Sequence, residues 1–240
     1  MKEIRTLNKD EIEVRVAQID KNWLTLLLYK NARVDMDVLD ETFGCMNWKR
    51  EHTRDNANCI VSIWDEDKHE WVSKEDTGTE SFSEAEKGLA SDSFKRACVN
   101  IGIGRELYSA PSIFVLPRKD MVKKGKDGEF YQNDKGKYET KTRFYVDYIT
   151  YDNNRKIENL IIRDNCGNSR FEKLTKETEK KLNTQFMKLK KMIEKAEEID
   201  KDFDREKFYE YFGVANDSQL NLDQRVEAMK LLEEKYKKGE

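Results

Sequence analysis

The sequence lacks any apolar run of the roughly 20 residues that a helix needs to cross a bilayer. Its most apolar stretch, Trp23 to Tyr29, has only the length of a strand. The first residues, Met1 to Arg5, are not followed by the apolar region of a secretory signal. We therefore expect a soluble protein that stays in the cytoplasm and has no membrane partner.

Cysteine and histidine are scarce, and their spacing does not suggest a metal site. No two cysteines form a C-x-x-C pair, and only His52 and His69 could supply nitrogen ligands. A structural zinc site normally requires such close ligand spacing, so none is expected. We interpret the four cysteines as core thiols in a reducing compartment. They are Cys45, Cys59, Cys98 and Cys166.

Motifs for nucleotide or acyl chemistry are also missing. There is no G-x-x-x-x-G-K-[ST] phosphate loop, and Gly102-Ile103-Gly104 is a lone G-x-G in the wrong context for a dinucleotide site. The acidic run Asp65 to Asp67 could hold Mg²⁺ in a nuclease, or it could be a solvated hairpin tip. Adjacent side chains at a turn converge poorly on one ion. The hairpin tip is the preferred interpretation, and we expect no enzyme, metal or cofactor.

Charge is abundant but unevenly distributed. Charged residues make up 39% of the chain, aromatic residues 10%, and the net charge is −3. The segment from Phe94 to Arg143, however, contains twelve basic residues and only six acidic ones. A basic segment in an acidic chain is typical of a surface that attracts a polyanion, although a solvated lysine-rich loop has the same composition.

The N-terminal half predicts a helix, a strand, a second helix and three strands. Asn8 followed by Glu11 resembles a capping box, with Ile12, Val16 and Ile19 at helical spacing. Trp23 to Tyr29 is expected to be a buried strand, and Gly44 should end the second helix. The second helix and the three antiparallel strands are expected at Val34 to Phe43, Trp48 to His52, Cys59 to Trp64 and Glu70 to Glu75.

The next helix, Ser83 to Ile101, is the best defined. Ser83 and Glu86 form a capping-box pattern. An apolar stripe follows at helical spacing and should pack across the strands. Lys95 and Arg96 lie beside this stripe rather than within it, so both can reach outward. The stripe consists of Ala90, Phe94, Ala97, Cys98 and Ile101.

The C-terminal half predicts a mobile loop or hairpin tip at Lys123 to Lys141, then a hairpin from Arg143 to Arg163 with its turn at residues 152–154. Helices without strands follow Phe171. The expected fold class is α+β: a small antiparallel sheet with a long helix packed across it, plus an all-helical C-terminal module. We expect two domains, residues 1–170 and 171–240.

Three segments, in order, resemble a known family. Glu41-Thr42-Phe43-Gly44, with Trp48 four residues after the glycine, resembles the E-x-F-G-x-x-x-W segment of the Rad-fifty-two-like single-strand annealing proteins. The run Ser91 to Ala97, followed by Ile101-Gly102, resembles their [ST]-D-[GS]-[LF]-K-R-A-x-x-x-[FI]-G helix. Glu11 to Val16 resembles the family's opening. Phage members of this family are often called Sak proteins.

The resemblance implies a β-β-β-α core that assembles into rings or short helical filaments. Single-stranded DNA would lie in a basic groove, held by its phosphates with the bases free to pair. Lys95 and Arg96 match the family's basic pair, and Arg33 resembles a further basic residue, although its spacing to Gly44 is one longer. Where eukaryotic members often carry another cation, this chain has Val99. The alternatives for that role are Lys49, Arg50 and Arg105.

The expected function is ATP-independent annealing of complementary strands in the recombination of a phage or mobile element, inside a bacterial host cell. The alternatives are an accessory protein that protects single strands without annealing them, and a metal-dependent nuclease. The expected partners are single-stranded DNA, further copies of the chain and, through the C-terminal helices, the host single-strand DNA-binding protein. Four aromatic residues could stack on bases or fill the core: Trp48, Trp64, Trp71 and Tyr108.

Overall fold

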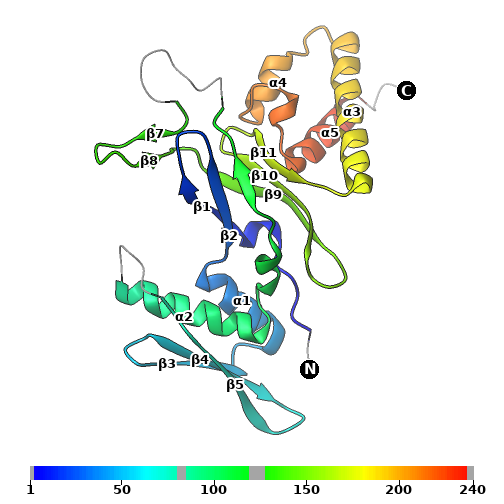
Figure 1. The fold of residues 1–240 in the computed structure, drawn as a ribbon. Helices are drawn as coiled ribbons and strands as arrows, with labels where there is room; N and C mark the ends of the chain where they lie inside the picture. Colours follow the sequence, from blue (N-terminus) through cyan, green and yellow to red (C-terminus); the bar gives the residue numbers. More distant parts are fainter. Residues whose placement is uncertain (1–2, 80–84, 119–127, 237–240) are drawn as a thin grey trace. The chain divides into compact units, whose positions relative to one another are not determined.

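The computed structural model describes residues 3–79, 85–118 and 128–236, with only the backbone for residues 85–87. The described chain forms two compact units (Figure 1). Unit 1 comprises Met1–Glu13, Leu28–Pro111 and Asn153–Ile157. Unit 2 comprises Val14–Leu27, Ser112–Asp152 and Glu158–Glu240. The domain boundary expected at residue 170 stays a prediction.

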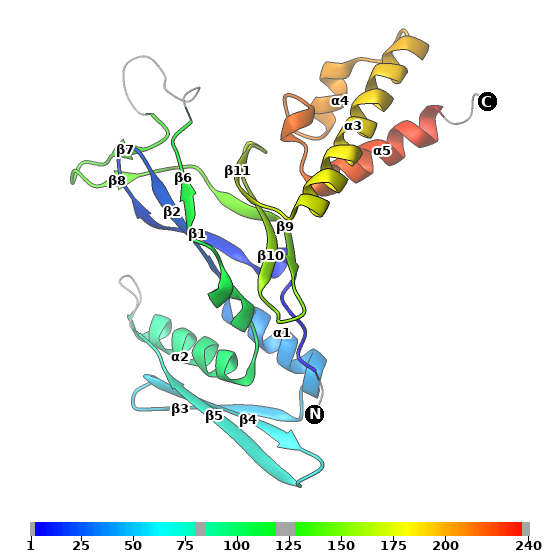
Figure 2. The ribbon, with the colours of Figure 1, turned by 45° about the vertical axis from the view of Figure 1, so that its right-hand side comes forward.

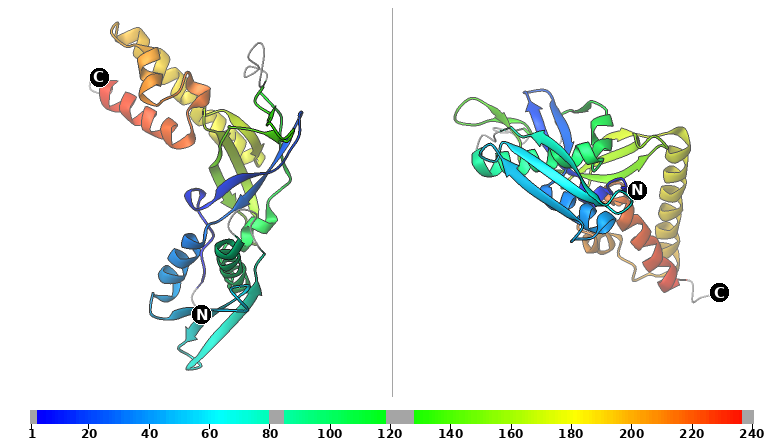
Figure 3. Two further views of the ribbon diagram at one scale, coloured as in Figure 1. Left: turned by 90° about the vertical axis from the view of Figure 1, so that its left-hand side faces the viewer. Right: turned by 90° about the horizontal axis from the view of Figure 1, so that it is seen from below.

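The described chain is a mixed α+β fold with antiparallel sheets, as the sequence predicts at this level. In unit 1, β3 (Trp48–Thr53), β4 (Asn58–Asp65) and β5 (Glu70–Thr77) form a sheet in that order. The helix α2 (Ala85–Ile101) lies along one face of this sheet, against β4 and β5 (Figures 2 and 3). The three strands begin and end close to where the sequence places them.

The apolar stripe of α2 explains this packing. Phe94, Ala97 and Cys98 are fully buried, and Cys59 and Val61 of β4 are buried with them. Trp48 stacks on Phe94, with 6.2 Å between the ring centroids. Alternate residues of β4 therefore face α2, as expected for a strand with one covered face. The capping box expected at Ser83 and Glu86 falls on side chains outside the described residues.

The helix α1 (Ala32–Phe43) also matches its prediction. The Asn31 side chain accepts hydrogen bonds from the backbone N–H groups of Arg33 and Val34, which caps the first turn. Gly44 follows the last turn at φ 88°, a conformation that glycine adopts without strain.

The helix expected after Asn8 is wrong. Glu11 does accept a hydrogen bond from the Asn8 backbone N–H, but the turn is a short 3-10 helix, Lys9–Glu11. The chain then continues as strand β1 (Glu13–Ile19). The apolar residues of β1 fit helical spacing, yet Val14, Val16 and Ile19 are β-branched and favour a strand once neighbouring strands are present.

Unit 2 contains most of a six-stranded sheet that the sequence did not predict as one body. Its order is β11-β10-β9-β1-β2-β6. The expected hairpin is confirmed as β9 (Phe144–Tyr151) and β10 (Ile157–Asp164). The sequence did not identify β11 (Ser169–Lys173), which pairs antiparallel with β10. The other strands are β2 (Leu24–Tyr29), which matches its prediction, and β6 (Ile113–Val115).

The segment Lys123 to Lys141 is described only from residue 128 onward. In that part, β7 (Tyr131–Gln132) and β8 (Tyr138–Glu139) form a two-stranded hairpin. Gly136 occupies its turn at φ 72°. The hairpin half of this expectation is therefore confirmed for the described residues.

The C-terminal helices are α3 (Lys176–Ile199), α4 (Arg205–Tyr211) and α5 (Leu222–Tyr236). Their buried apolar residues form a core of their own, with Leu189 and Ile193 of α3 beside Ala228 and Leu232 of α5. Among the described residues, no helix is both long and apolar enough to span a membrane.

The four cysteines divide between the core and the surface. Cys59 and Cys98 are buried, as predicted, and burial raises the pKa of the Cys59 thiol to about 11. Cys45 and Cys166 are exposed, so the interpretation of all four as core thiols is wrong for these two. Both exposed cysteines lie in turns outside the periodic segments, where the sequence gives no burial pattern.

Candidate nucleic-acid interface

Lys95 and Arg96 lie on the solvent side of α2, where the helix period places them. Their side chains are 27% and 45% exposed, while the flanking Phe94 and Ala97 are fully buried. Lys95 Nζ is 3.7 Å from Asp92 Oδ1, and Arg96 Nε is 3.5 Å from an oxygen of Asp76. Partly exposed ion pairs of this length contribute little free energy, so a phosphate can replace either carboxylate.

Lys49 and Arg50 are neighbours on β3, and a strand directs neighbouring side chains to opposite faces. The Arg50 guanidinium carbon lies 4.7 Å from the centre of the Phe94 ring, on the side of the sheet that faces α2. Lys49 Nζ instead lies 4.4 Å from the centre of the Trp71 ring, on the outer face. The structure therefore places Arg50, but not Lys49, on the face of the sheet that α2 covers.

Arg105 and Arg33 are both exposed, and they lie on different elements of unit 1. The Arg105 guanidinium donates hydrogen bonds to the carbonyls of Val99 and Asn100 at 3.0–3.2 Å. Arg105 thus satisfies carbonyl groups in the last turn of α2, which is a structural task. Arg33 lies in the first turn of α1.

A buried ion pair beneath α2 was missed by the sequence analysis. Lys30 pairs with Asp35, and the two side chains are only 5% and 0% exposed. Lys30 Nζ also donates to the backbone carbonyl of Lys95 at 3.4 Å. The pair therefore holds the backbone of α2 from inside at the residue whose side chain points outward. The sequence signal that could have indicated this pair is Asp35, a charged residue that directly follows Val34 on the buried face of the helix.

Burial shifts the pKa values of Asp35 and of the neighbouring Cys98. Loss of water raises the pKa of Asp35 to about 6, against the opposing attraction of the Lys30 ammonium. Burial also raises the pKa of the nearby Cys98 thiol, and the Asp35 carboxylate raises it further. A Cβ on Gly104 would lie 2.4 Å from Lys30 Cε, so a side chain at position 104 would displace the end of this lysine from its place beside Asp35.

Some of the four aromatic candidates belong to the packing of unit 1, and others are exposed. Trp48 stacks inside unit 1 and donates from Nε1 to Asp40 at 2.6 Å, so it belongs to the packing. Trp64 and Trp71 meet edge to face, with 5.5 Å between ring centroids, on the outer face of the sheet. Trp71 and Tyr108 are exposed and remain candidates for stacking on bases.

The acidic run at residues 65–67 forms a turn. Asp65 accepts hydrogen bonds from the backbone N–H groups of Asp67 and Lys68, and these bonds, with the Lys68 ammonium, lower its pKa. The carboxylate thus stabilises the link between β4 and β5. Over the described ranges, no group of three or more His, Cys, Asp or Glu residues could hold a metal ion.

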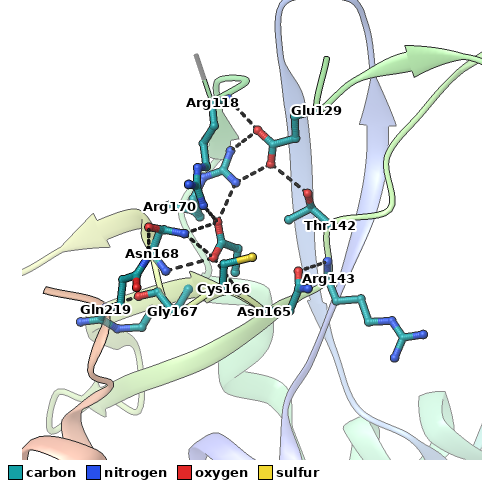
Figure 4. Close-up of polar contacts among 12 residues, drawn as sticks. Arg118, Glu129, Thr142, Arg143, Asn165, Cys166, Gly167, Asn168, Arg170 and Gln219 are labelled. Atoms are coloured by element: carbon teal, nitrogen blue, oxygen red, sulfur yellow. Dashed lines mark hydrogen bonds and ion pairs between the residues drawn. The ribbon is translucent and has the colours of Figure 1, made fainter. Parts of the chain in front are cut away.

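Unit 2 contains a second polar cluster (Figure 4), in which the side chains of Glu129, Asp164 and Arg170 are buried. The Glu129 carboxylate accepts hydrogen bonds from Thr142 Oγ1 and from two nitrogens of Arg170. Arg170 also reaches Asp164 at 3.1 Å. Although burial opposes it, hydrogen bonds from the backbone and side chain of Asn168 lower the pKa of Asp164. The charges are mutually satisfied, which indicates a structural cluster.

The C-terminal segment is bonded to the sheet of unit 2. Asp147 of β9 accepts from Arg163 Nε at 2.6 Å and from the backbone N–H of Leu222 at 3.1 Å. Arg163 donates to the carbonyl of Ser218. A Cβ on Gly167 would lie 2.3 Å from the Gln219 carbonyl oxygen. These close contacts tie the start of α5 to the strands.

Comparison of the chain with protein-family models, with curated proteins and with solved structures finds no match.

Proposed function

We propose that the protein binds single-stranded DNA through its phosphates and anneals complementary strands without ATP, in the recombination of a phage or mobile element within a bacterial host cell. The observation that carries the proposal is the exposed pair Lys95 and Arg96 on α2, with Arg50 on the same side of the β3–β4–β5 sheet. In this proposal, that sheet and α2 are the β-β-β-α annealing core of the family that the sequence resembles.

The physical argument starts from what annealing requires. A strand held by its phosphates keeps its base edges free for pairing, and lysine and arginine make such contacts without reading sequence. Lys95 and Arg96 are attached to a buried helix face and a buried ion pair, so their backbone positions are fixed. Their ion pairs with Asp92 and Asp76 are long, at 3.7 and 3.5 Å, and a phosphate can take the place of these pairs.

The test mixes complementary oligonucleotides with the full chain, without ATP or metal. The wild type should accelerate duplex formation, and the Lys95→Ala/Arg96→Ala variant should lose most of this acceleration while remaining folded. Its matched control is Lys21→Ala/Lys68→Ala, which removes two exposed cations from turns. Binding without acceleration would indicate an accessory protecting protein, and Mg²⁺-dependent strand cleavage would indicate a nuclease.

The partners follow as part of the same proposal. Further copies of the chain would form a ring or short filament, and the C-terminal helices would dock the host single-strand DNA-binding protein. On α3, Lys188 pairs with Glu233 and Lys190 with Asp217. The lysines better placed for an acidic partner peptide are Lys176, Lys180 and Lys191, which line a shallow hollow along one face of α3.

The bonds from Asp147 and Arg163 to the C-terminal segment make point variants a cleaner docking test than a truncation. Charge reversal at Lys176, Lys180 and Lys191 should leave annealing of bare strands unchanged. The same variant should fail on strands coated with the host protein. Equal activity of variant and wild type on coated strands would contradict docking on this face.

A further inference from the structure

Both end strands of the unit 1 sheet present an edge that pairs with no strand among the described residues. β3 and β5 are the outer strands of the order β3-β4-β5. β5 is exposed along almost its entire length of 8 residues. An exposed edge of this length is a template for pairing with another chain unless something covers it.

The register determines which backbone groups point outward. The Trp64 N–H donates to the Asn47 carbonyl, so odd-numbered residues of β3 point their backbone groups toward β4. The Gly78 N–H donates to the Ala57 carbonyl, so even-numbered residues of β5 do the same. The outward groups therefore belong to even-numbered residues on β3 and odd-numbered residues on β5.

The two edges carry opposite charge. β3 has Lys49 and Arg50 side by side, followed by Glu51, and β5 has Glu75 and Asp76 side by side, preceded by Lys74. Lys49 faces the outer side with Trp71, and alternation along β5 places Glu75 on that side too. Arg50 lies over Phe94 and Asp76 lies near Arg96, so both belong to the side of α2.

One parallel alignment satisfies the charges, the faces and the hydrogen bonds together. It places Lys49 opposite Glu75 and Arg50 opposite Asp76. In a parallel pair, a residue with outward groups bonds to the two residues flanking its opposite number. Glu75 would thus bond with the backbones of Trp48 and Arg50, both of which point outward.

Pairing of like edges is disfavoured. An antiparallel pair of β5 edges that places Lys74 opposite Asp76 also places Glu75 opposite its own copy. An antiparallel pair of β3 edges that places Lys49 opposite Glu51 places Arg50 opposite its own copy. Like charges directly opposite each other oppose cross-strand pairing. We propose that β5 of one copy adds in parallel to β3 of a second copy of this chain. Such head-to-tail pairing leaves a free edge at each end, so it continues into a ring or a filament.

The groups involved can change partners at little cost. Lys49 gives up a contact with the exposed Trp71 ring, and Arg50 gives up one with the edge of the buried core at Phe94. The Glu75 carboxylate gives up a hydrogen bond from Asn58 Nδ2 at 2.6 Å. Asp76 is 3.5 Å from Arg96, and the Glu75 carbonyl accepts one hydrogen bond, from Asn100 Nδ2 at 3.1 Å. A carbonyl oxygen has two lone pairs, so this bond leaves room for a second donor.

The inference rests on the self-association in the proposed function. The test is sedimentation of the full chain without DNA, so a failure of assembly can be told apart from a failure of annealing. Glu75→Lys/Asp76→Lys should convert large assemblies of the wild type into monomers. Lys49→Glu/Arg50→Glu should do the same. An equimolar mixture of the two variants should reassemble because each altered edge then meets its complement. The control, Glu66→Lys/Glu70→Lys, changes the net charge equally outside the paired segment and should keep the wild-type size.

Cross-linking provides a second measurement that does not depend on charge reversal. With Cys45 and Cys166 replaced by serine, Lys49→Cys/Glu75→Cys should give a ladder of disulfide-linked multimers on mild oxidation. The out-of-register control, Lys49→Cys/Glu70→Cys, should not. A monomeric wild type at micromolar concentration, a mixture that stays monomeric, or equal ladders from both cysteine pairs would overturn the proposal.

Discussion

The Asp35 carboxylate and the Lys30 ammonium form an ion pair inside unit 1, and one of the two carboxylate oxygens, Oδ2, is buried without a hydrogen-bond partner. A buried pair must recover the free energy lost on removal from water, and a half-satisfied carboxylate recovers only part of it.

Asp35 should titrate near pH 6 in the folded protein, because burial raises its pKa from the ordinary value of 3.8. The folded chain then holds this proton more tightly than the unfolded chain. The contribution of Asp35 to the free energy of unfolding is therefore greatest below about pH 4 and falls as the pH rises through 6, by about 3 kcal/mol. Carbon NMR of the carboxyl group measures the midpoint directly, and a midpoint at or below 4 would contradict the prediction.

Replacing Arg170 should destabilise the protein more than any exposed arginine does. Arg170→Met removes the guanidinium that the buried carboxylates of Glu129 and Asp164 share, although Asp164 keeps its ion pair with Arg118 at 3.2 Å. We expect the free energy of unfolding to fall by about 3–5 kcal/mol. Urea unfolding followed by circular dichroism provides the measurement. Arg143→Met is the control because the Arg143 side chain points away from the cluster in Figure 4; equal losses in both variants would refute the structural role.

The salt dependence of DNA binding should show whether Lys95 and Arg96 touch phosphates. Each neutralised phosphate contributes about −0.7 to the log–log slope of affinity against salt for single strands. The double alanine variant should therefore lower the slope by about 1.4 as well as the affinity. Titrations at several salt concentrations decide the point. Reduced affinity with an unchanged slope would indicate that these cations act without contacting phosphates.

Gly167→Ala should loosen the C-terminal segment. Gly167 has φ 80°, and the added methyl group would meet the Gln219 carbonyl oxygen at 2.3 Å. Gly136→Ala is the matched control, since Gly136 has φ 72° with no atom within 4 Å of the new methyl group. The difference between the two variants isolates the clash from the backbone strain, which alone costs about 1–2 kcal/mol. Thermal unfolding should rank Gly167→Ala clearly below Gly136→Ala; equal melting temperatures would show that the segments separate without cost.

The elements that the sequence predicted correctly are those with a single strong period. Phe94, Ala97 and Cys98 repeat at helical spacing, and Cys59 and Val61 alternate, so local pattern alone determines both buried faces. The spacing of Val14, Val16 and Ile19 fits both the helical period and the strand period, each only in part. Only their place between β9 and β2 decides for the strand.

Of the candidate site, the sequence could predict only the residues that point to solvent. The position of Lys95 and Arg96 follows from helix geometry, whereas Lys49 and Arg50 could be separated only once the sheet had defined two faces. The Lys30–Asp35 pair and the Arg170 cluster join residues from different elements. No local pattern encodes which buried charges will meet across such distances in the chain.

Because Gly104 leaves room for the Lys30 side chain, which pairs with Asp35, we expect positions 30, 35 and 104 to depend on one another during evolution. A side chain at position 104 would occupy the place of the Lys30 stem, and without Lys30 the Asp35 carboxylate would lose the cation that it pairs with. Relatives that gain a side chain at position 104 should therefore also have replaced the lysine and the aspartate, most simply with apolar residues. Substitutions at these three positions should be inherited as a set.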